Sequence, residues 1–221
     1  MSELPPPPSS VNEWKTRNFG SALKGVVVPF QWISWFNLIY RKLRGPLWED
    51  ELTSLTAGKT PAANAPAWTA FGPSGVNYQW AFGVNDHIQT AGFHVTHRVK
   101  PGSKIYPHIH WTTDGIDTNT VKWEISYTIA KGHNQEAFPA DSTLQLEQAG
   151  SGTAWQHMIV EATDAQALDV PQVDSLIIAD VKRITNGGTD NADTVFCLFI
   201  DYHFEMDRFG TPQKAPDFYA Y

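Results

Sequence analysis

The clearest pattern in the sequence is Val121-Lys122-Trp123-Glu124-Ile125-Ser126-Tyr127-Thr128-Ile129, in which apolar and polar residues alternate without a break. Because successive side chains of a β-strand point to opposite faces, this period of two predicts a strand with one buried face. Phe93–Val99 shows the same alternation at most positions. The same criteria place further strands near 78–84 and over 104–111, 142–148, 155–163, 175–184 and 194–206.

Clusters of turn-forming residues separate these strands: Asp114-Gly115, Gly132-His133-Asn134, Gly150-Ser151-Gly152 and Asn186-Gly187-Gly188. No pattern of helical length follows residue 60, apart from a possible short piece over Glu161–Leu168. Strands without crossover helices between them must pair antiparallel. We therefore predict an all-β fold, an antiparallel β-sandwich that is closed as a jelly roll of about eight strands.

The N-terminal part of the chain differs in charge from the rest. Residues 1–50 carry a net charge of +2, from six basic and four acidic side chains. The net charge of the whole chain is −7, so the other 171 residues carry a net charge of −9. This difference predicts an N-terminal arm over 1–50 that serves assembly. A connector rich in proline, alanine and glycine is predicted over 51–75, followed by the sandwich over 76–210 and a C-terminal tail over 211–221.

The arm opens with Pro5–Pro8, which favour an extended polyproline conformation. Within Gln31–Arg44 the apolar residues recur at helical spacing, and Gly45-Pro46 follows, so a short amphipathic helix is predicted there. Large aromatic side chains are typical anchors of protein interfaces. The predicted interface residues of the arm are Trp14, Trp32, Trp35, Phe36 and Tyr40.

Composition excludes several classes of protein. The net charge of −7 argues against nucleic acid as a partner. The most apolar stretch, Val26–Tyr40, has fifteen residues and several polar interruptions, whereas a membrane span needs about 20, so no membrane partner is expected. The N-terminus has no features of a secretory signal. The single cysteine, Cys197, excludes an internal disulfide, and its apolar neighbours predict an unreactive thiol in the core.

The pair in Pro107-His108-Ile109-His110 is the sharpest candidate for chemistry. On a strand both imidazoles point to one face, where they can share a metal ion. With Gly102 before it and Asp114 after it, the pair partly resembles the first motif of the cupins, although that motif has glutamate where Asp114 stands. The second cupin motif is absent from the sequence.

Our interpretation of His108 and His110 is that they are packed or interfacial residues, so we expect no metal, no cofactor and no catalytic residue. The alternative is a cupin-like metal-dependent enzyme using His108, His110 and Asp114, with His94, His97, His157 or His203 as further candidates. Alternation places Asp201 and Glu205 on the solvent face of the last strand. A carbohydrate-binding module is a third possibility, and it requires exposed tryptophans among Trp68, Trp80 and Trp155.

The sequence resembles proteins encoded in tailed-bacteriophage genomes. The resemblance covers roughly residues 47–210, and Pro107-His108-Ile109-His110-Trp111 is its most specific element. It also rests on Leu47–Asp50, Val121–Tyr127, Phe138-Pro139, Asp201–Phe204 and Phe209-Gly210. The resemblance implies a virion structural component with a β-sandwich and no enzymatic role.

From this resemblance we expect a non-enzymatic head decoration or cement protein that is made in the host cytoplasm and located in the virion. Its expected partners are further copies of itself, by analogy in a homotrimer, and the major capsid protein or other virion proteins. A structural protein of the tail or its collar is the alternative within the virion.

Overall fold

The computed structural model describes residues 34–40, 45–169, 172–207 and 210–218. The chain divides into two compact units, Met1–Leu47 and Trp48–Tyr221. In the first unit a helix covers residues 34–40, within the predicted amphipathic segment. The rings of Trp35 and Phe36 on this helix contact each other with centroids 5.1 Å apart.

Two of the predicted interface residues, Trp14 and Trp32, lie outside the described residues. In the described part of the chain, no helix is both long enough and apolar enough to span a membrane.

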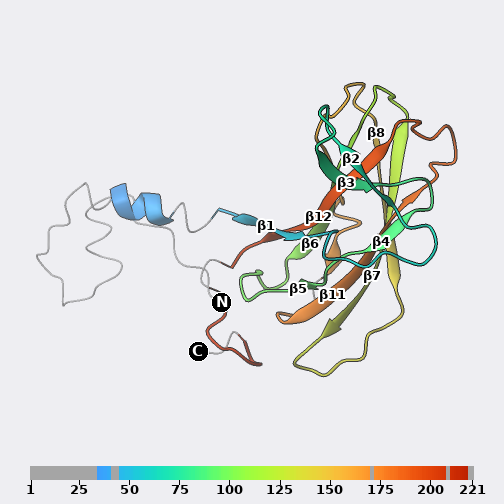
Figure 1. Cartoon of the computed structure of the whole chain (residues 1–221). Coiled ribbons are helices and arrows are strands. Elements are labelled where there is room, and N and C mark those ends of the chain that lie inside the picture. The colour runs from blue at the N-terminus through green and yellow to red at the C-terminus, as the bar shows by residue number, and fades with distance from the viewer. Residues whose placement is uncertain (1–33, 41–44, 170–171, 208–209, 219–221) are drawn as a thin grey trace, which may run out of the picture. The chain divides into compact units, whose positions relative to one another are not determined.

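The second unit consists of two antiparallel sheets (Figure 1). One sheet has seven strands, in which β6 and β12 are the central pair: β1 (Trp48–Thr53), β2 (Ala67–Phe71), β3 (Asn77–Ala81), β6 (Lys104–Thr113), β9 (Met158–Glu161), β10 (Leu168–Asp169) and β12 (Val195–Glu205). The other sheet has five strands: β4 (His87–Gln89), β5 (Phe93–His94), β7 (Thr120–Lys131), β8 (Ser142–Ala149) and β11 (Ser175–Ile184).

The core lies between the two sheets. It is formed by the side chains that the long strands bury at every second position. In β7 the residues Val121, Trp123 and Ile125 are buried, and the residues between them are partly exposed. From the facing sheet, Trp111 of β6 enters the same core, and its Nε1 donates a hydrogen bond to Gln148 Oε1 on β8 at 2.9 Å. The predicted antiparallel β-sandwich is confirmed.

The described part of the chain has twelve strand segments, where about eight were predicted. The additional ones are short: β1, β2, β4 and β10 have two to six residues each. Such strands are stabilised by pairing with distant segments, as β1 is by β12. Their own sequences therefore show little of the apolar–polar alternation that predicts a strand. The predicted strand over Phe93–Val99 is only two residues long, and Glu161–Leu168 contains a single turn in place of a helix.

The boundaries between the predicted regions also differ. Residues 48–50, placed in the arm from their sequence, belong to β1 and pair with β12. The predicted connector over 51–75 contains the rest of β1 and all of β2. Neither strand can be predicted from charge or proline content. A strand forms because its backbone groups pair with those of a neighbouring strand, and this pairing does not require a particular composition.

Candidate metal centre and aromatic surface

Three segments that lie far apart in the sequence occupy neighbouring strands of the seven-stranded sheet. Trp48–Asp50 opens β1, Pro107–Trp111 lies in β6, and Asp201–Phe204 lies in β12. They are adjacent because β12 pairs with β6 on one side and with β1 on the other.

The alternation of β6 separates core residues from a second set of side chains. Ile109 and Trp111 face the core, so His108 and His110 point to the opposite, outward face of the sheet. Asp201 of β12 is directly opposite His108 in the strand register and shares that face. The fold thus adds a carboxylate to the predicted histidine pair.

These three side chains form a buried cluster, with exposed fractions of 2% for His108, 8% for His110 and 6% for Asp201. His108 Nε2 closely approaches Asp201 Oδ1, and His110 Nε2 lies 3.4 Å from the same oxygen. Within the described residues, His110 Nε2 has no hydrogen-bond partner, and Asp201 Oδ1 has only its contacts with the two histidines. One atom from each of the three side chains lies within 4.8 Å of the other two.

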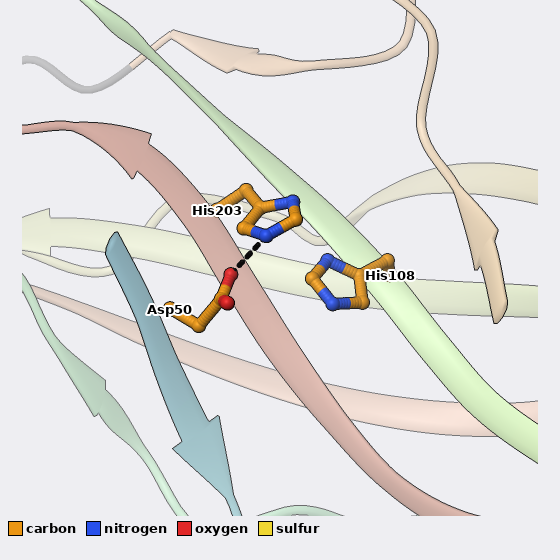
Figure 2. Close-up of side chains that lie close together, drawn as sticks. All are labelled: Asp50, His108 and His203. Atoms are coloured by element: carbon orange, nitrogen blue, oxygen red, sulfur yellow. Dashed lines mark ion pairs between the residues drawn. The ribbon is translucent and has the colours of Figure 1, made fainter. Parts of the chain in front are cut away.

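A second, more exposed group borders this cluster (Figure 2). His203 Nε2 of β12 closely approaches Asp50 Oδ1 of β1, and its Nδ1 is 2.6 Å from Glu161 Oε1 of β9. The rings of His203 and His108 have centroids 4.2 Å apart, so the two groups are continuous. Partial burial lowers the pKa of His203 and favours its neutral form.

His110 is held from two sides. Its Nδ1 shares a hydrogen bond with His157 Nε2 at 2.7 Å, and its ring stacks on Phe199 with centroids 4.0 Å apart. Burial is the main cause that lowers the pKa of His110, with the nearby His108 and His157 adding to it and Asp201 opposing it. A neutral imidazole is the form that binds metal ions.

Two imidazole nitrogens and one carboxylate oxygen are a donor set suited to a divalent transition metal such as Zn²⁺ or Fe²⁺. Hard cations such as Ca²⁺ and Mg²⁺ prefer oxygen ligands throughout. Of the predicted candidates, the structure brings together His108 and His110 and places His157 and His203 beside them.

The third predicted ligand, Asp114, lies elsewhere. It is exposed in the turn after β6, where its Oδ1 accepts a hydrogen bond from the backbone N–H of Thr194 at 2.8 Å. Asp201 takes its place in the cluster, and the expectation that Asp201 faces solvent is wrong, because it is buried. Only the strand register reveals this partner, since the two segments are distant in sequence.

An aromatic surface occupies the β2–β3 hairpin of the same sheet. Trp68 stacks on Tyr78 with centroids 6.4 Å apart and meets Trp80 edge-on at 4.9 Å. Trp68 is 48% exposed, Tyr78 50% and Val76 76%. We call Trp68, Val76, Tyr78 and Trp80 the aromatic hairpin. Of the three tryptophans considered for sugar binding, Trp68 is exposed, whereas Trp80 and Trp155 are half-buried.

Comparisons with known proteins give similarity of fold only. No family model matches the chain, and no curated protein matches it. Among solved structures, a CBM35 from Cellvibrio japonicus Abf62 is 9% identical, with a TM-score of 0.39, over 70% of this chain and 92% of that one.

Two other solved structures are similar at the same level. TmCBM61 in complex with β-1,4-galactotriose is 12% identical, with a TM-score of 0.28, over 75% of this chain and 93% of that one. Eiger TNF from S. frugiperda is 13% identical, with a TM-score of 0.31, over 77% and 99%.

Proposed function

We propose that this chain is a non-enzymatic structural component of a tailed-phage virion, a head decoration or cement protein that self-associates and contacts the capsid. The observation that carries the proposal is the aromatic hairpin, a folded strand pair on which Trp68, Val76 and Tyr78 are exposed large apolar side chains. The resemblance of the sequence to tailed-phage proteins supports the virion as its location.

The hairpin has the chemistry of a protein interface. Tryptophan and tyrosine are enriched among residues that dominate binding energy, and here they are already stacked on one another, which limits the entropy lost on binding. In the described part of the chain, β2 pairs only with β3, so it is an edge strand with backbone groups available to a second chain. An edge strand of this kind invites pairing with another strand.

The histidine cluster also favours a structural role over a cupin-like enzyme. His108, His110 and Asp201 are each less than a tenth exposed, and a substrate needs an accessible coordination position. The segments that carry the phage resemblance meet at this cluster on β1, β6 and β12. Because these segments lie next to one another in the sheet, we infer that the proteins which share them also share this part of the fold.

The test measures self-association of the full-length chain by native mass spectrometry and light scattering. We expect a closed oligomer, and we expect the double variant Trp68→Ala/Tyr78→Ala to be largely monomeric with an unchanged circular dichroism spectrum. The matched control is Phe138→Ala, because Phe138 is equally exposed but lies outside the hairpin. A monomeric wild type, or a double variant that still assembles like wild type, would contradict the proposal.

Location in the virion needs a separate experiment. Immunogold labelling of purified phage particles and of tail-less heads should show the protein on the heads. Labelling confined to tails would support the tail or collar alternative, and absence from purified particles would rule out the virion role.

A further inference from the structure

We propose that His108, His110 and Asp201 bind one divalent transition-metal ion of the Zn²⁺ class, which links β6 to β12 on the outward face of the seven-stranded sheet. The inference is independent of the virion proposal, because metal binding is measured on the isolated chain. It concerns a structural ion and not a catalytic one.

The ligand atoms are already close to coordination distances. Bonds from Zn²⁺ to imidazole nitrogen and carboxylate oxygen are about 2.0–2.2 Å, so two ligand atoms of a tetrahedral site lie about 3.4 Å apart. His110 Nε2 and Asp201 Oδ1 are separated by 3.4 Å, and His108 Nε2 is closer still to the same oxygen. For one ion to take all three side chains as ligands, His108 Nε2 and Asp201 Oδ1 must move apart from their present close contact.

The position of the proton on the His110 ring supports a cation between His110 Nε2 and Asp201 Oδ1. When His110 Nδ1 donates its proton to His157 Nε2, His110 Nε2 holds a lone pair directed at the Asp201 carboxylate. Two acceptors that face each other in a buried site repel, and His110 Nε2 has no hydrogen-bond partner within the described residues, whereas Asp201 Oδ1 is already in close contact with His108 Nε2. Buried polar atoms normally have partners, so the unpartnered His110 Nε2 beside this carboxylate supports a cation bound between them.

The surroundings supply what a metal site requires beyond its ligands. The second nitrogen of a ligating imidazole usually contacts a hydrogen-bond acceptor that fixes the ring. His110 Nδ1 has His157 in this role, whereas His108 Nδ1 has no hydrogen-bond partner within the described residues and Glu161 Oε1 is 3.9 Å from it. Together with Asp50, Glu161 adds negative charge around the centre and favours a divalent cation there.

The proposed ion joins the two central strands of the sheet. β6 and β12 pair along most of their length, with a bulge between Cys197 and Phe199 that shifts the register next to His110. A metal bound only by the folded chain adds its binding free energy to the stability of that chain. Zinc should therefore raise the melting temperature.

The experiment uses the untagged full-length chain, stripped with a chelator and then titrated with Zn²⁺ against a competing chelator of known affinity. We expect about one zinc ion per chain and a higher melting temperature with zinc. Loss of a partner outside the ligands typically weakens a site by about 10–100-fold, so His110→Ala and Asp201→Asn should each weaken zinc binding by more than about 100-fold.

The matched control is His87→Ala. His87 Nδ1 pairs with Asp180 at 3.0 Å in the five-stranded sheet, so it is a histidine–carboxylate pair without a second histidine. This variant should bind zinc like wild type. If Asp201→Asn fails to fold, the wild type and His110→Ala still decide the matter. A wild type that holds far less than one zinc ion, or a His110→Ala variant with unchanged affinity, would overturn the proposal.

Discussion

Replacement of Arg183 by methionine tests how much a buried arginine stabilises the segments around Phe82 and Asn191. Arg183 lies in β11 and is only 5% exposed. Its guanidinium donates to two backbone carbonyls, through Nη1 to Phe82 O at 2.8 Å and through Nη2 to Asn191 O at 2.7 Å. Burial lowers its pKa, but an arginine remains charged at any physiological pH.

The cost of Arg183→Met follows from these contacts. A hydrogen bond from a charged donor contributes about 1.5–3 kcal/mol, and removing the donor leaves two carbonyls without it. Methionine retains much of the apolar stem and avoids the desolvation of the charge, which offsets part of the loss. We expect the free energy of unfolding to fall by about 2–4 kcal/mol. For a chain of this size that corresponds to about 4–16 °C in melting temperature.

The assay is urea unfolding followed by tryptophan fluorescence, with thermal unfolding as a second probe. The control is Lys182→Met, the neighbouring residue in β11, which is half-buried and is expected to change stability by less than about 0.5 kcal/mol. If Arg183→Met unfolds within about 1 kcal/mol of wild type, Phe82 O and Asn191 O find replacement donors, and the proposed role of Arg183 in joining the two segments is refuted.

Two further predictions concern the arm and the thiol. Deleting residues 1–45 should leave a folded β body, because Trp48–Tyr221 forms its own compact unit, but the product should no longer assemble on heads; normal decoration of heads by this truncation would refute the assembly role of the arm. Burial raises the pKa of the Cys197 thiol, so it should react with a disulfide reagent only after unfolding, and rapid reaction of the native protein would place it outside the core.

Local periodicity was sufficient to predict the long strands but not the short ones. The alternation over residues 121–129 defines β7, because each buried position in it packs against the facing sheet. β1 also alternates in burial, yet its sequence carries three acidic residues and resembles a polar loop. Its stability comes from six residue pairs with β12, and no local pattern contains that information.

The same distinction applies to the histidine cluster. A period of two was enough to predict that His108 and His110 share a face. Asp114 is a candidate third ligand from its place in the cupin-like motif, but the chain turns there and its carboxylate accepts a hydrogen bond from Thr194. Asp201 becomes the partner only through the register of β12 against β6, which depends on the whole sandwich.

The two proposals concern one sheet but are expected to respond separately to mutation. The strand β12 pairs with β6 along the proposed metal centre, whereas it meets β3 of the aromatic hairpin only at Phe196 and Cys197. Truncating Trp68 and Tyr78 removes interface area without touching a ligand, so zinc binding should persist when assembly is lost. Removing zinc should lower the melting temperature of the chain but leave the aromatic hairpin folded, since β2 and β3 pair directly over five residues. If one substitution abolished both properties in a folded chain, the ion and the interface would belong to a single shared site.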